Sequence, residues 1–116
     1  YIPILTPEDE MTFDIVLTTL VTITAYAPGC GATQATKSGA WPTAGHSVAV
    51  DPKVFPLGTL FKIPSMPQTA PFIAMDTGRK VKGHHIDVYM TSCREAIEWG
   101  RQRQMRIHVL KPRGRP

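Results

Sequence analysis

The chain has 116 residues, of which 42% are hydrophobic and 19% charged, so one globular domain with a single modest core is expected. Its net charge of +4 permits an anionic partner, but no basic stripe with interleaved aromatic residues is present, which argues against a nucleic-acid partner. No apolar run approaches the roughly 20 residues of a membrane helix, so no integral membrane segment is expected.

The ends of the chain differ in character from its middle. Residues 1–16 are acidic and broken by prolines, and we interpret them as an arm or linker. Tyr1 starts without a basic and apolar leader, which suggests a processed product or an excised fragment. Residues 17–110 are the expected domain, and residues 111–116 read as a basic, solvated tail.

Short runs rich in Val, Ile and Thr, separated by Pro and Gly, predict strands within this domain. A long loop is predicted over residues 27–45, and loops of that length are usually functional. The expected strands cover residues 17–26, 46–50, 59–63, 71–75, 85–90 and 105–110. This spacing predicts a mainly β fold, a small closed barrel.

One helix is predicted from Ser92 to about Gln102. Ser92 is a suitable N-cap, and Glu95 three positions later completes a capping-box pattern. Gly100 weakens the end of the helix.

Three aspartates, Asp51, Asp76 and Asp87, each follow a run of strand-forming residues. An ionised carboxylate beside a packed strand is costly unless it is hydrogen-bonded, paired or used in chemistry. One acidic site on the barrel would account for all three.

The cysteines and histidines leave fewer indications. Cys30 and Cys93 could form a disulfide in an oxidising compartment or could be two unrelated buried thiols, and sequence alone leaves both open. His84 and His85 are adjacent, so in a strand they point to opposite faces and would not chelate one ion together. No metal and no cofactor are expected.

A set of short motifs lies along the expected domain. The motifs are Thr24-Ala25-Tyr26, Gly29-Cys30-Gly31, Ser47 to Pro52, Phe55 to Thr59, Asp76-Thr77-Gly78, Lys82-Gly83, Ile86 to Tyr89, Glu95-Ala96 and Trp99-Gly100. In their order and spacing they resemble the three-aspartate domain family. This family shares a double-psi β-barrel with the catalytic barrel of membrane-bound lytic transglycosylase A, and it includes small transglycosylases linked to bacterial stationary-phase survival. The resemblance implies a six-stranded double-psi β-barrel with one short helix.

The family's activity would be cleavage of the β-1,4 bond between N-acetylmuramic acid and N-acetylglucosamine in peptidoglycan, which leaves a 1,6-anhydro end. By position in the motif, Asp87 would be the acid/base and Asp76 would stabilise positive charge or keep the neighbouring acid protonated. Because the sugar's own 6-hydroxyl replaces water as nucleophile, one carboxyl group can act as acid and then as base. Tyr89 is expected on the face of Asp87.

Other residues are candidates for substrate contact, each with a structural alternative. Thr24 and Tyr26 could contact sugar or belong to the strand and core. Lys82 could bind a carboxylate of the substrate or be solvated, and Trp41 could be a sugar platform or a loop anchor. Asp51 could line the site, but an Asp-Pro turn after a strand favours a structural role.

The chain departs from the family where Arg79 and Lys80 replace the usual glycine and alanine. Two long cations at the edge of a cleft could grip an anionic glycan or narrow the cleft. The main alternative to an enzyme is a non-catalytic glycan-binding or structural barrel of a cell-envelope or phage protein. Either function implies peptidoglycan strands as partner and an extracytoplasmic location, or a phage product acting on the wall; the sequence indicates no oligomeric state.

Overall fold

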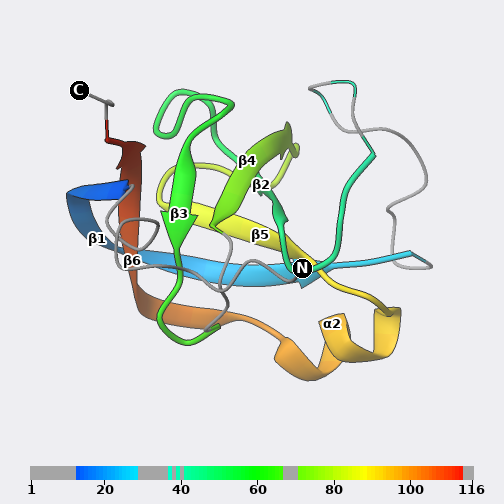
Figure 1. Cartoon of the computed structure of the whole chain (residues 1–116). Helices are drawn as coiled ribbons and strands as arrows, with labels where there is room; N and C mark the ends of the chain where they lie inside the picture. Colours follow the sequence, from blue (N-terminus) through cyan, green and yellow to red (C-terminus); the bar gives the residue numbers. More distant parts are fainter. Residues whose placement is uncertain (1–12, 29–36, 38, 40, 67–70, 114–116) are drawn as a thin grey trace, which may run out of the picture.

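The computed structural model describes residues 13–28, 37, 39, 41–66 and 71–113. Six strands close into a barrel with one short helix beside it (Figure 1), which confirms the predicted fold class. In chain order the elements are β1 (Phe13–Tyr26), β2 (Ser47–Val50), β3 (Leu60–Lys62), β4 (Phe72–Thr77), β5 (His85–Tyr89), α2 (Cys93–Trp99) and β6 (Gln102–Pro112).

The order of strands around the barrel is β1-β5-β2-β4-β3-β6, and β6 closes back onto β1. The pairs β1·β5 and β2·β4 are parallel, and the other pairs are antiparallel. β2 therefore lies between β5 and β4, two strands that carry one aspartate each. This arrangement brings distant parts of the sequence to one region of the barrel wall.

The barrel interior is filled by alternate residues of each strand. Along β2, Val48 and Val50 are fully buried in the core, opposite Val88 and Ile86 of β5. Since side chains alternate along a strand, Ala49 and Asp87 point the other way, to the outer face of the barrel. The remaining core residues include Val21, Ile23, Phe55, Phe61, Ile63, Phe72, Ala74 and Ile107.

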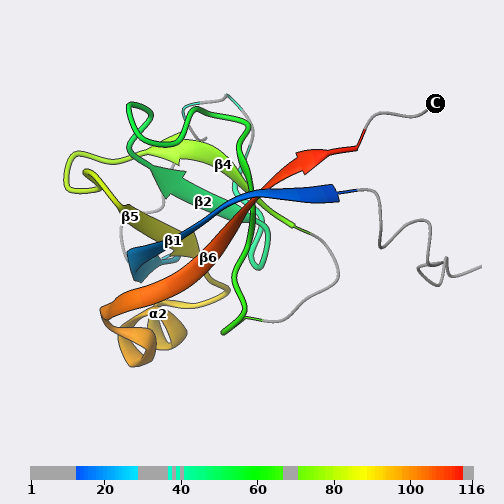
Figure 2. The same ribbon diagram turned by 90° about the vertical axis from the view of Figure 1, so that its left-hand side faces the viewer.

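The longest strands, β1 and β6, form a two-stranded ribbon whose open end projects beyond the barrel (Figure 2). β1 begins at Phe13, which pairs with Pro112, so the strand reaches into the segment expected to be an arm. At the same end the Arg113 guanidinium pairs with Asp14, with Nε 3.0 Å from Oδ1. Cross-strand pairing, which a single sequence does not reveal, extends both strands past their predicted ends.

The helix is shorter than predicted. The Ser92 hydroxyl accepts a hydrogen bond from the Glu95 N–H at 3.2 Å, as the capping pattern requires. The helix ends at Trp99, before the expected Gln102, because Gly100 adopts a φ of 67° that stops the helical path. Among the described residues, no helix has the length and apolar character to cross a membrane.

Candidate active site on the outer face of the barrel

Four neighbouring strands contribute one residue each to a row across the barrel wall. Thr24 of β1 is in register with Asp87 of β5, which is in register with Ala49 of β2, which is in register with Asp76 of β4. Register partners point to the same side of a sheet, and neighbouring strands lie about 4.8 Å apart. Asp76 and Asp87 therefore flank Ala49 on one face. We call these four residues the carboxylate row.

Asp87 lies partly buried in this row. The Thr24 hydroxyl donates to Asp87 Oδ1 at 2.9 Å when the carboxyl is ionised. Burial raises the pKa of the Asp87 carboxyl and the negative charge of Asp76 adds to this rise, whereas a hydrogen bond that Thr24 donates to the ionised carboxylate, a charged His85 and Arg101 oppose it. The net rise means that Asp87 keeps its proton to a higher pH than an exposed aspartate.

Two tyrosines lie on the same face, two register positions beyond the Thr24–Asp87 pair. Tyr26 pairs with Tyr89 across β1 and β5, and their rings meet edge to face with centroids 5.2 Å apart. This confirms the expectation that Tyr89 shares the face of Asp87. Burial and the nearby charges of Asp76 and Asp87 raise the pKa of the Tyr26 phenol, so it stays neutral. Its hydroxyl is buried and finds no hydrogen-bond partner within the described residues.

Asp76 is held by main-chain groups. Its Oδ1 accepts hydrogen bonds from the N–H of Thr77 at 2.8 Å and from the N–H of Lys37 at 2.9 Å. Lys37 belongs to the long connection between β1 and β2, so this connection reaches the carboxylate row.

Asp51 lies outside the row and ties two turns together. Oδ1 accepts the Lys53 N–H at 3.1 Å, and Oδ2 accepts the Gly83 N–H at 2.9 Å. These two backbone hydrogen bonds lower the pKa of Asp51, and the bond from Gly83 has the larger effect. The bonds link the turn after β2 to the turn before β5, where Gly83 has a φ of 68°. This geometry supports the structural alternative, and a role in substrate binding stays a prediction.

His85 is a site residue that sequence reasoning considered only as a metal ligand. Its Nε2 lies 2.7 Å from the Thr24 hydroxyl, and only 8% of the residue is exposed. Burial lowers its pKa. The available signal was its position two residues before Asp87, which puts both on one face of a strand. The neighbouring His84 ring contacts Phe55 instead, with centroids 6.0 Å apart. Within the described residues, no three His, Cys, Asp or Glu side chains are grouped to hold a metal.

The remaining predicted site residues lie at or near the surface. Trp41 is 68% exposed, and Lys82 is exposed near Asp51. Arg79 and Lys80 are also exposed. Their contacts with a substrate remain predictions. Cys93 begins α2, but Cys30 lies outside the described residues, so the predicted disulfide stays a prediction.

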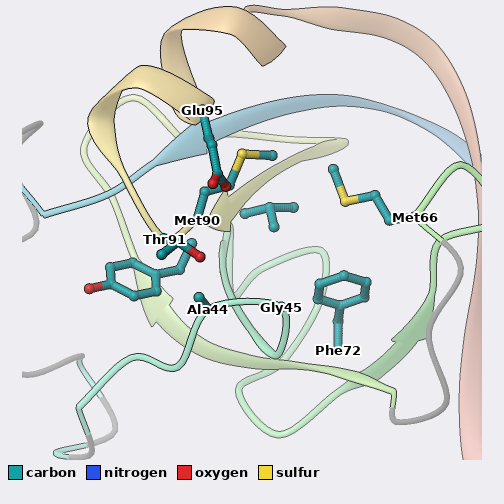
Figure 3. Close-up of a pocket in the computed structure, with 9 residues that line it drawn as sticks. Ala44, Gly45, Met66, Phe72, Met90, Thr91 and Glu95 are labelled. Atoms are coloured by element: carbon teal, nitrogen blue, oxygen red, sulfur yellow. The ribbon is translucent and has the colours of Figure 1, made fainter.

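A separate pocket of about 320 Å³ lies where β5 ends and α2 begins (Figure 3). The Glu95 carboxylate points into it from the helix, and Met66 faces it from the opposite side. Val88 and Tyr89 at the end of β5 line this pocket, whereas Asp87 is not among its lining residues. The remaining lining residues are Ala44, Gly45, Phe72, Met90 and Thr91.

Comparison with known proteins decides the family. The family model described as the 3D domain matches residues 46–111, which include all three aspartates. The chain belongs to the 3D domain family. Among relatives from Bacillus subtilis (strain 168), it is 33% identical over 90 residues to the SPbeta prophage-derived protein YorM, covering 71% of this chain and 38% of YorM. It is 40% identical over 53 residues to the cell wall-binding protein YocH, covering 46% of this chain and 17% of YocH.

The barrel of this 3D domain is also similar to a solved enzyme structure. MltA from Escherichia coli, described as having a unique lytic transglycosylase fold, matches with a TM-score of 0.54 and 25% identity. The match covers 71% of this chain and 29% of the MltA chain. The chain thus spans well under half the length of these proteins.

Proposed function

We propose that this domain is a lytic transglycosylase, which cleaves the β-1,4 bond between N-acetylmuramic acid and N-acetylglucosamine in peptidoglycan and leaves a 1,6-anhydro-muramyl end. The observation that carries the proposal is the Asp87 carboxyl, which is partly buried, has a raised pKa and shares a face with Asp76. A general acid near neutral pH needs such a raised pKa. The similarity to MltA supports the choice of reaction.

In this proposal Asp87 acts twice. Its acid proton goes to the glycosidic oxygen as the bond from that oxygen to the anomeric carbon breaks. The 6-hydroxyl oxygen then bonds to the anomeric carbon and returns its own proton to Asp87, so no water is consumed. Asp76, two strands away, stabilises the positive charge that develops on the ring.

The other predicted residues would bind the glycan. Tyr26 and Trp41 offer aromatic surfaces, and Lys82 offers a cation for a substrate carboxylate. Thr24 would act through Asp87 and His85, which already hold its hydroxyl. Asp51 would act indirectly, because its carboxylate is already occupied by two backbone N–H groups.

The setting of the reaction follows from its substrate. Peptidoglycan lies outside the cytoplasm, so we infer an extracytoplasmic location, or a phage protein that acts on the wall. The similarity to the cell wall-binding protein YocH supports the first setting and that to prophage-derived YorM the second.

A wall-binding domain without catalysis is the second candidate, and the similarity to YocH favours it. It would use the same face of the barrel to hold glycan strands. Such a domain would sediment with intact peptidoglycan and leave its chemistry unchanged.

Mass spectrometry of purified peptidoglycan after incubation with the protein tests the proposal. The wild type should release anhydromuropeptides, and Asp87→Asn should release none. Asp14→Asn makes the same chemical change at an exposed carboxylate on the projecting ribbon and should retain activity. Sedimentation with the wall but no anhydro ends from the wild type would favour the binding domain instead.

A further inference from the structure

Thr24 joins two titratable side chains that stand two positions apart on β5. Its hydroxyl oxygen lies 2.9 Å from Asp87 Oδ1 and 2.7 Å from His85 Nε2. A hydroxyl carries one proton, so it can donate to only one of these groups at a time. The hydrogen-bonding states of Asp87 and His85 are therefore linked through a single atom.

The main chain also acts on the His85 ring. The Lys80 backbone favours the protonated ring, as an accepting carbonyl does. Because Nε2 faces Thr24, we infer that Nδ1 is the nitrogen that donates. A neutral imidazole has one N–H, so the neutral ring keeps its proton on Nδ1 and presents a bare Nε2 to Thr24.

We propose that His85 is a positioning residue that keeps Asp87 in its acid form, acting through Thr24. The bare Nε2 accepts the Thr24 hydroxyl proton, and the Thr24 oxygen then accepts the acid proton of Asp87. If Asp87 loses that proton, Thr24 must either leave the carboxylate without its hydrogen bond or give up the bond to His85. Ionisation thus costs one hydrogen bond, and this cost favours the acid.

The surroundings of both groups favour the same neutral pair. Burial raises the pKa of Asp87 and lowers the pKa of His85. A hydrogen bond donated by Thr24 to the carboxylate and a charged His85 would each lower the pKa of Asp87, and neither is present while the neutral His85 ring accepts the Thr24 proton. The charge of Asp76 from β4 further favours the acid, whereas Arg101, between α2 and β6, favours the carboxylate and also lowers the pKa of His85. Tyr26 faces the site from β1 as a neutral phenol, because its pKa is raised.

The inference rests on the proposed function in one respect, that the acid proton of Asp87 is used to cleave a glycan. The hydrogen bonds from Asp87 through Thr24 to His85 can be tested without a glycan. The first test replaces Thr24 by Val, which has a similar shape but no hydroxyl. The pKa of Asp87 is then followed by carbon NMR of its carboxyl group in the whole chain. We expect this pKa to fall, because the acid loses its acceptor.

A simpler role for Thr24, as a permanent donor to the carboxylate, predicts the opposite result. In that case Thr24→Val would raise the pKa of Asp87, and a raised or unchanged value would overturn the proposal. Thr18→Val is the matched control, since the exposed Thr18 hydroxyl lies 2.8 Å from His108 Nδ1, in a second Thr-His pair on the β1·β6 ribbon. It should leave the Asp87 pKa unchanged.

A second test needs no variant, and it therefore stands even if Thr24→Val fails to fold. Nitrogen NMR of the wild type reports which nitrogen of the neutral His85 ring is protonated. We expect a protonated Nδ1 and a bare Nε2; a protonated Nε2 would contradict the proposal. If the NMR tests succeed and no glycan is cleaved, the proposed function fails while the positioning role of His85 stands.

Discussion

Asp76 and Asp87 are both register partners of Ala49, from opposite sides of β2. Ala49 lies between them in the carboxylate row. Their separation across two strand spacings is about 10 Å between backbones, close enough for the charge of Asp76 to help raise the pKa of Asp87. The barrel topology thus couples two residues that belong to different strands.

Removing the charge of Asp76 should make Asp87 a stronger acid. We expect Asp76→Asn to lower the pKa of Asp87, because like-charge repulsion no longer favours the protonated form. Carbon NMR of the Asp87 carboxyl measures this shift, and the alkaline limb of glycan cleavage should move to lower pH with it. Glu98→Gln, which removes an exposed carboxylate from α2, is the control and should leave the titration unchanged. If the Asp87 pKa is unchanged in Asp76→Asn, the charge of Asp76 does not act on Asp87 and this part of the account is wrong.

Filling the space beside Ala49 should harm cleavage more than folding. Ala49→Val adds two methyl groups on the face of the carboxylate row, whereas Ala74→Val adds the same two groups inside the core. Overpacking at either buried position should cost about 1–3 kcal/mol in the free energy of unfolding, measured by urea titration. Only Ala49→Val should also reduce cleavage per folded molecule. Equal losses of cleavage in the two variants would argue against a site at Ala49.

The raised pKa of Asp87 predicts a stability cost that depends on pH. The folded state binds this proton more tightly than the unfolded chain, in which the pKa of Asp is about 3.9. The carboxyl is therefore neutral in both states at low pH, and it destabilises the fold as the pH rises through the folded pKa. We expect Asp87→Asn to raise the urea midpoint at neutral pH, with a gain that vanishes below about pH 3.9.

Asp51→Asn should show the opposite pH dependence and serves as the comparison. Its pKa is lowered by backbone hydrogen bonds, so its stabilisation is present above the unfolded pKa of about 3.9 and is lost as the pH falls through the folded value. The variant should lower the urea midpoint at neutral pH and approach the wild type in acid. A destabilised Asp87→Asn would show that the Asp87 carboxylate stabilises the fold at neutral pH, and a stabilised Asp51→Asn would show that the Asp51 carboxylate destabilises it. Either result would contradict the account.

A disulfide between Cys30 and Cys93 remains a prediction that thiol chemistry can test. Thiol titration of the unfolded, unreduced protein should detect no free thiol. Reduction should then lower the free energy of unfolding by about 4 kcal/mol, because the bond closes a long loop in the unfolded chain. Two free thiols in the unreduced protein would show that Cys30 and Cys93 are not bonded to each other.

The strands were predictable because their signal is local. Runs of β-branched residues mark β1 and β5, and alternation within β5 correctly placed Tyr89 on the face of Asp87. The ends of elements were less predictable. Gly100 stops α2 through its positive φ, and the start of β1 at Phe13 depends on pairing with the far end of the chain.

The site was predictable only in part, because its residues lie on different strands and are brought together by the pairing of those strands. Asp76 and Asp87 could be named from motifs, but the Ala49 between them follows from which strands are neighbours. Thr24 was expected to contact sugar, and in the structure its hydroxyl bonds to Asp87 and His85. No local pattern indicates that a residue on β1 lies beside β5.

Cleavage in water labelled with a heavy oxygen isotope tests the central claim most directly. If Asp87 serves as both acid and base while the sugar's own hydroxyl closes on the anomeric carbon, the new muramyl ends carry no label and weigh one water less than a hydrolysis product. All such ends should disappear in Asp87→Asn and persist in Asp14→Asn. Labelled reducing ends, or unlabelled anhydro ends that persist in Asp87→Asn, would contradict the account.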